Sequence, residues 1–186
     1  MSRLAPFTLI ISAAVLAGCT TPSTGTYVKL EPTYEEASAS QFVGANREAV
    51  QRLVAGLDLK ALGTTPMLVA TVVNVNDLRK TAPLGRTLSE QYASQLAAQG
   101  LLVKELKLRG DIYVREETGE LMLSRELKDI AQIHSAAMVL VGTYSAAATS
   151  TFISLKLVRT DTGQIVRGHD YALPNNADVL KLLAQK

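Results

Sequence analysis

The stretch MLVATVVNVN, residues 67–76, is a nearly unbroken run of apolar and β-branched residues. A strand that is covered on both faces has this composition, because neither face needs polar side chains for water. A second run of the same kind, MVLVGTY at residues 138–144, follows later in the chain. Two buried strands predict the centre of a layered α/β fold.

The segments on either side of the first run have helical spacing. We expect one helix from Gln41 to Leu62, ended by Gly63, and another from Pro83, ended by Gly100. Proline suits the first turn of a helix, where its missing N–H would be unpaired anyway. The apolar stripes are Val43, Val50, Leu53, Val54 and Leu57 in the first helix and Leu84, Leu88, Tyr92, Leu96 and Ala97 in the second.

The rest of the chain predicts further strands and two short helices. We expect a strand from Leu101, a hairpin within 110–123, a helix capped by Ser124, antiparallel strands at 151–158 and 164–173, and a last helix at 177–183. The predicted fold class is therefore α/β, with a mixed sheet layered with helices in a single domain, residues 41–186.

The amino terminus has the pattern of a lipoprotein signal peptide, residues 1–18. Arg3 precedes an apolar stretch from Leu4 to Ala17, whose helix would rise about 21 Å and fall short of the ~30 Å bilayer core. The following LAGC, residues 16–19, resembles the bacterial lipobox, in which the cysteine is acylated and becomes the first residue after cleavage. We expect Cys19 to carry the lipid, palmitate included.

Residues 19–40 read as a lipid-anchored flexible tether, since Pro, Ser, Thr and Gly dominate them. Thr20, rather than aspartate, follows the cysteine, which by resemblance to the enterobacterial sorting rule indicates the outer membrane. We expect a protein on the periplasm-facing side of that membrane.

Composition excludes several classes of function. The 19 Lys and Arg nearly balance the 17 Asp and Glu, so no broad positive field for nucleic acid is expected. One cysteine forms no internal disulfide, and two histidines are too few for most zinc sites, so we expect neither metal nor cofactor. Ser124, Asp129 and His134 fall in one predicted helix and its cap without sharing a face well, so no catalytic residue and no enzyme is predicted.

Several short segments, taken in order, resemble the FlgO-like domain of bacterial envelope lipoproteins. They are TAPLGR at 81–86, EQ at 90–91, LMLSR at 121–125, VLVGTY at 139–144, LV at 157–158, TG at 162–163 and YALP at 171–174. The likeness runs from Met67 to Pro174. It implies a fold akin to the amino-terminal domain of TolB and to the curli-secretion protein CsgG.

The resemblance also implies a non-catalytic outer-membrane lipoprotein that acts as an envelope scaffold or assembly factor for flagellar stability and motility. Its partners would be envelope proteins, either flagellar ring components or, as an alternative, those of a CsgG-like secretion or polysaccharide-export assembly. Self-association into a homo-oligomer is a further alternative. A third alternative function, beside the flagellar and the secretion or export assemblies, is that of a periplasmic ligand-binding module.

The ligand-binding alternative rests on the turn before the second helix. Gly85 and Arg86 lie near a predicted helix amino terminus, where N–H groups attract anions. The turn lacks a glycine-rich phosphate cradle, and a purely structural role explains it better: Pro83 sets φ, and Gly85 permits close packing. Gly85 and Arg86 are therefore the candidate anion-binding residues.

Overall fold

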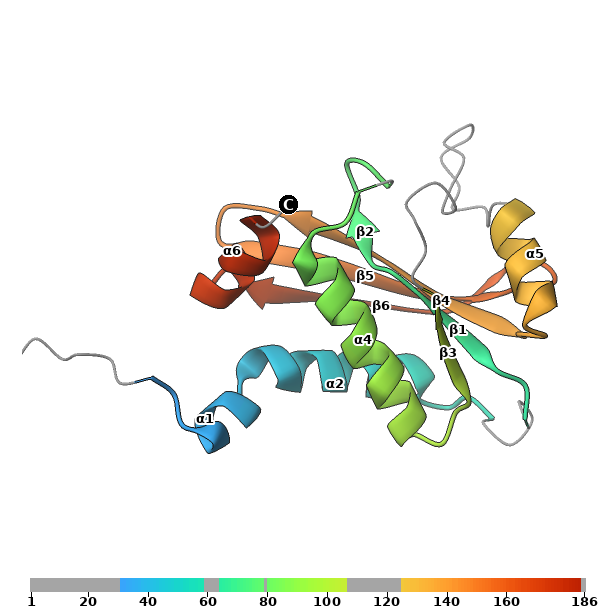
Figure 1. Ribbon diagram of the computed structural model, residues 1–186, viewed down its shortest axis with the longest axis horizontal. Coiled ribbons are helices and arrows are strands. Elements are labelled where there is room, and N and C mark those ends of the chain that lie inside the picture. Colours follow the sequence, from blue (N-terminus) through green and yellow to red (C-terminus); the bar gives the residue numbers. More distant parts are fainter. Residues whose placement is uncertain (1–30, 59–63, 79, 107–124, 185–186) are drawn as a thin grey trace, which may run out of the picture. The chain divides into compact units, whose positions relative to one another are not determined.

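Helices and strands are interspersed along the chain, and three consecutive strands precede the last helix (Figure 1). A computed structural model describes residues 31–58, 64–78, 80–106 and 125–184. Residues from Thr33 onward form one compact unit. The helices are α1 Tyr34–Ser38, α2 Gln41–Val54, α4 Pro83–Ala98, α5 Arg125–Ile133 and α6 Ala177–Ala184; the strands are β1 Met67–Ala70, β2 Val73–Asn74, β3 Val103–Leu106, β4 Met138–Ala146, β5 Ser150–Arg159 and β6 Ile165–Pro174.

The strands form one six-stranded mixed sheet in the order β3-β1-β4-β5-β6, with β2 paired to β4. Strand β1 runs parallel to β3 and β4, whereas β4, β5 and β6 are antiparallel neighbours. The buried strands at 67–70 and 138–146 lie side by side at its centre. The predicted α/β class and mixed sheet are thus confirmed.

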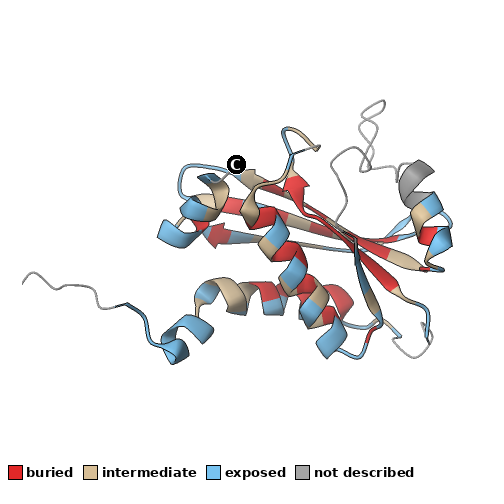
Figure 2. Ribbon diagram, viewed as in Figure 1, coloured by how far each residue is buried: buried red, intermediate tan, exposed pale blue. Residues whose placement is uncertain are grey.

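Helices cover the two faces of the sheet unequally (Figure 2). Helices α2, α4 and α6 pack over one face, burying Leu53, Leu88 and Tyr92 against Leu140 and Leu155. We call this the helix face. On the opposite face α5 packs through Ala131 over Leu68, Val139 and Val158. The half of that face along β5 and β6 beyond Val158 carries no described helix (Figure 1), and we call it the open face.

Local sequence explains where the two long helices begin and end. Helix α4 begins at Pro83 as predicted, and Gly100 follows it with φ 86°, a left-handed conformation that glycine adopts without strain. Helix α2 begins at Gln41 as predicted and is capped by Ser40, but its predicted end at Leu62 is wrong. It ends at Val54 because Gly56, with φ 74°, turns the chain before Gly63 is reached.

The predicted strand at 67–76 is interrupted. Val69 pairs with Leu140 and Val73 with Thr143, so four steps along β1–β2 match three along β4. One extra residue therefore sits between β1 and β2, which is a β-bulge. The bulge separates Val69, which faces the helix face, from Val73, which faces α5.

Part of the predicted tether is helical. Thr33 and Glu36 form a capping box at the start of α1, although every residue of that helix is exposed. The structure thus places a capped turn within 19–40, and the part of that range up to residue 30 lies outside the described residues. The predicted hairpin at 110–123 and the predicted cap Ser124 also lie outside them. In the described part of the chain no helix is long and apolar enough to cross a membrane.

Candidate functional site: a groove on the open face

The TAPLGR segment holds the bulge between β1 and β2. The Thr81 hydroxyl donates to the Val72 carbonyl at 2.7 Å, and the Val72 N–H donates to the Ser89 hydroxyl at 2.8 Å. A bulge leaves backbone groups without ladder partners, and buried groups of this kind are costly unless they are bonded. Two hydroxyls from α4 and its approach satisfy both groups of Val72, which gives this part of the motif a structural role.

Gly85 is buried where α4 crosses the bulge. A Cβ atom on Gly85 would stand 2.0 Å from the Val72 carbonyl oxygen and 2.3 Å from the Thr81 hydroxyl, so only glycine fits. Arg86 is exposed. The Ala82 N–H, next to this turn, already donates to the Tyr144 hydroxyl at 3.0 Å. The turn thus has a packing role, and anion binding at Gly85 and Arg86 stays a prediction.

A buried polar network joins α2, α4 and β6. The Tyr171 hydroxyl donates to Asn46 Oδ1 at 2.6 Å, and Asn46 Nδ2 donates to Gln91 Oε1 at 2.6 Å. The Tyr92 hydroxyl donates to that of Tyr171. Burial raises the pKa of Tyr92 well above its ordinary value, and its hydrogen bond to Tyr171 raises it further. Burial also raises the pKa of Tyr171, and the network joins helices α2 and α4 to strand β6.

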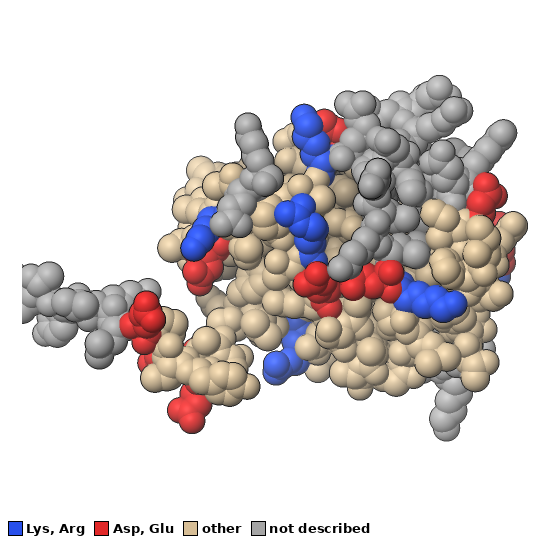
Figure 3. Space-filling model, viewed as in Figure 1, with Lys and Arg blue, Asp and Glu red and all other residues tan. Residues whose placement is uncertain are grey.

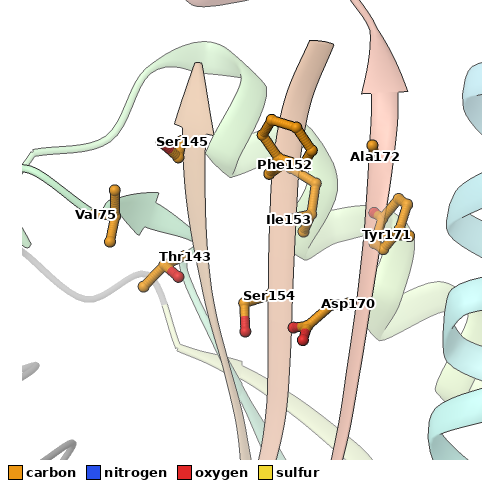
Figure 4. Close-up of a pocket in the computed structure, with 9 residues that line it drawn as sticks. All are labelled: Val75, Thr143, Ser145, Phe152, Ile153, Ser154, Asp170, Tyr171 and Ala172. Carbon is orange, nitrogen blue, oxygen red and sulfur yellow. The ribbon is translucent and has the colours of Figure 1, made fainter. Parts of the chain in front are cut away.

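The open face contains a groove of about 500 Å³ (Figure 4). It spans strands β4, β5 and β6, and Val75, just after β2, forms one side. Phe152 stands in it with 56% of its surface exposed. The lining residues are Val75, Thr143, Ser145, Phe152, Ile153, Ser154, Asp170, Tyr171 and Ala172. An apolar concavity with few polar groups is typical of a binding site.

The groove forms because small side chains surround one large ring. Along β5, Phe152 and Ser154 alternate with the buried Ile153 and Leu155, so they point to the open face. Phe152 pairs across the ladder with Ala172, and Ser154 with Asp170. The Asp170 carboxylate is the only charged group among the described residues that line the groove. The site therefore offers an aromatic surface, hydroxyls and one negative charge.

The face seen in Figure 3 shows no large patch of a single charge among the described residues. On the face seen in Figure 3, acidic and basic side chains are interspersed. Within the described ranges no three His, Cys, Asp or Glu side chains gather as a metal site would require. Asp129 is exposed and His134 lies just past the end of α5. The proposed lipidation site, Cys19, lies outside the described residues.

The groove was missed in the sequence, although a signal was present. In TFISLKLV, residues 151–158, the alternate positions Phe152, Ser154 and Lys156 form one face of the strand. An aromatic residue on an otherwise polar face marks a position that the core does not require. The contribution of Val75 depends on the bulge, which the sequence did not reveal.

The fold has known relatives of low sequence identity. The C-terminal domain of LpoB from Salmonella enterica is 17% identical with a TM-score of 0.50, over 72% of this chain and 98% of that one. PelC from Paraburkholderia phytofirmans, a dodecamer, is 13% identical with a TM-score of 0.44, over 65% and 81%. TolB from Acinetobacter baumannii is 11% identical with a TM-score of 0.32, over 61% and 24%.

At this identity the likeness to LpoB shows the fold alone, and the two lower scores carry no argument. The expected kinship with TolB and CsgG therefore stays a prediction. A comparison with curated protein sequences gives no significant match.

The chain thus has an α/β fold similar to that of the LpoB C-terminal domain. The family model described as FlgO protein matches residues 47–178, well over half of the chain. The chain therefore belongs to the FlgO protein family, as its motifs predicted. Membership supports the class of envelope lipoprotein.

Proposed function

We propose that this chain is a non-catalytic outer-membrane lipoprotein that acts as an envelope scaffold or assembly factor for flagellar stability and motility. Its signal peptide ends at residue 18, and the segment 19–40 connects the lipid to the domain. Family membership and the LAGC sequence support the anchor, and the groove around Phe152 supports docking of another envelope protein. The groove is the observation that carries the scaffold role.

The anchor has a direct chemical test. In cells grown with radiolabelled palmitate, the native protein is expected to carry the label. The Cys19→Ser protein is expected to carry none, because it has no thiol to acylate. Each buried methylene contributes about 0.8 kcal/mol, and stable anchoring takes more than one chain. The native protein is therefore expected in the outer-membrane fraction. Equal labelling of both proteins would disprove lipidation at Cys19.

The scaffold role is tested at the groove. A strain without the gene is expected to swim less and to carry fewer or unstable filaments, counted by electron microscopy. The native gene restores both, and a Phe152→Ser variant does not, because the aromatic surface is lost. Leu180→Ser is the matched control, since Leu180 on α6 is 50% exposed and lies outside the groove.

Two results would remove parts of the proposal. Normal swimming and filament number in the deletion strain would eliminate the flagellar part. Full rescue by Phe152→Ser at native abundance would eliminate docking at the groove. Affinity purification of the tagged protein from detergent extract separates the assemblies: flagellar ring proteins support the proposal, and secretion or polysaccharide-export proteins contradict its flagellar part.

A further inference from the structure

The open face changes character along strand β5. Val158 is buried beneath α5, and Lys156, Ser154 and Phe152 follow on the same face toward the other end of the strand. Lys156 and Ser154 are polar, as expected on a solvent-exposed face. Phe152, at the end of this row, is the largest exposed apolar side chain of the described sheet. Phe152 is therefore not required by the described core.

Hydrogen bonds of the backbone hold Val75 at one side of the groove, and small side chains lie beside the Phe152 ring. Val75 is fixed because its N–H donates to the Tyr144 carbonyl at 2.9 Å, which extends the pairing of β2 with β4. The loop that follows is closed by a hydrogen bond from the Asn74 N–H to the Lys80 carbonyl, also at 2.9 Å. Ser145 and Ala172 leave space beside the ring (Figure 4). This shape admits an apolar side chain laid against Phe152.

Among the described residues that line the groove, Asp170 alone is charged. Its carboxylate lies beside Ser154 (Figure 4), and it is exposed and forms no ion pair within the described part of the chain. Lys156 is the basic residue next along the same face, and it pairs across the ladder with Gly168. Lys156 and Asp170 do not form a salt bridge with each other among the described residues. The negative charge is therefore available to an incoming cation.

We propose that the groove binds a segment of another envelope protein that places an apolar side chain on Phe152 and a Lys or Arg side chain beside Asp170. This inference rests on the proposed docking function and names its chemistry. The apolar Phe152 ring suits an apolar side chain, and the Asp170 carboxylate, the one charged group among the described lining residues, suits a basic side chain, so a polypeptide segment that carries both matches the groove.

Photo-crosslinking in the cells that carry the gene tests the proposal with the full-length lipidated protein. The photoreactive amino acid p-benzoylphenylalanine replaces Phe152 in one strain and Leu180 in the control strain. Crosslinked peptides are identified by mass spectrometry. A partner segment captured from position 152 and not from 180, with a Lys or Arg within a few residues of the crosslink, is the expected result.

Variants at Asp170 then test the charge. Loss of an exposed ion pair in Asp170→Asn is expected to lower the crosslink yield about two- to fivefold, and the added repulsion in Asp170→Lys about five- to twentyfold. Glu90→Lys on the exposed side of α4 makes the same change in net charge outside the groove and should leave the yield unchanged. Changing the partner's basic residue to Glu should restore the yield with Asp170→Lys.

The outcomes separate this inference from the function on which it rests. A captured segment without a basic residue, or an Asp170→Lys yield equal to native, overturns the charge pairing while docking at the groove stands. Capture of glycan or lipid alone overturns the choice of a polypeptide. Absence of any crosslink at 152 in cells whose swimming depends on the gene overturns both. Equal thermal unfolding of native and Asp170→Lys protein shows that the effects are not due to misfolding.

Discussion

Replacing Gly85 by alanine should disrupt the packing of α4 on the bulge between β1 and β2. The new methyl group would stand 2.0 Å from the Val72 carbonyl oxygen, and a backbone atom cannot move aside cheaply. Forced packing costs about 1–3 kcal/mol, and a buried Val72 carbonyl that loses its bond from Thr81 costs about 1–3 kcal/mol more. The higher helix propensity of alanine returns about 1 kcal/mol. We expect a net loss of about 3 kcal/mol in the free energy of unfolding.

The same substitution at Gly44 is the matched control. Gly44 also lies inside a helix, α2, but nothing stands within 4 Å of the position its Cβ would take. Gly44→Ala should therefore stabilise the protein by up to about 1 kcal/mol. Urea unfolding followed by circular dichroism measures both variants. Because about 1 kcal/mol shifts the melting temperature of a domain of this size by about 2–4 °C, thermal scans should show shifts of opposite sign.

Two results would contradict a close contact between α4 and the bulge: unfolding of Gly85→Ala at the same urea concentration as the native protein, or shifts of both variants in the same direction. Either result would mean that α4 does not press against the bulge as closely as the 2.0 Å approach requires.

Three further predictions follow from the buried bonds and the ion pair. Ser89→Ala should lower the free energy of unfolding by about 1–3 kcal/mol in urea titrations, because the buried Val72 N–H loses its acceptor. The raised pKa of Tyr92 means that its contribution to stability is fully present below the unfolded value near pH 10 and is lost as the pH rises above it; Tyr92→Phe should therefore flatten the loss of stability above pH 10. The hydrogen bond from Arg159 holds the pKa of Asp161 at about 2, so Arg159→Gln should raise it toward the ordinary value in an NMR titration of the carboxyl carbon.

Each of these has an internal comparison. Ser94 donates to the Glu90 carbonyl as Ser89 does to that of Gly85, but it is exposed, so Ser94→Ala should change stability by less than about 0.5 kcal/mol. An alkaline profile of Tyr92→Phe that parallels the native one would contradict the role of burial. A pKa near 2 for Asp161 in Arg159→Gln would mean that the Thr162 N–H, which also donates to that carboxylate, suffices alone.

Periodicity predicted most of the fold because long, regular elements dominate it. Helix α4 and strands β4 to β6 lie where their spacing and flanking Gly and Pro placed them. The early end of α2 was missed because Gly56 precedes further apolar residues that continue the stripe. The break in the strand at 67–76 was missed because apolar side chains lie on both faces there, so a shift of one residue leaves no trace in the pattern.

The candidate site was less predictable because it depends on contacts between distant segments. Gly85 was recognised as a residue that permits close packing, but its partner, Val72, is fixed only once the bulge is known. The groove combines Val75, Phe152 and Asp170 from three parts of the chain. Their meeting follows from strand order and register, which composition does not encode.

The bonded network around Asn46 also has a mechanical meaning. If the proposed lipid at Cys19 holds the domain, tension enters along the chain that leads into α2, which begins at Gln41. The side chain of Asn46 joins that helix to Gln91 on α4 and to Tyr171 on β6. Tension that reaches the first packed helix is thus shared between a second helix and an edge strand, and α2 would have to break both bonds before it could peel away from the sheet.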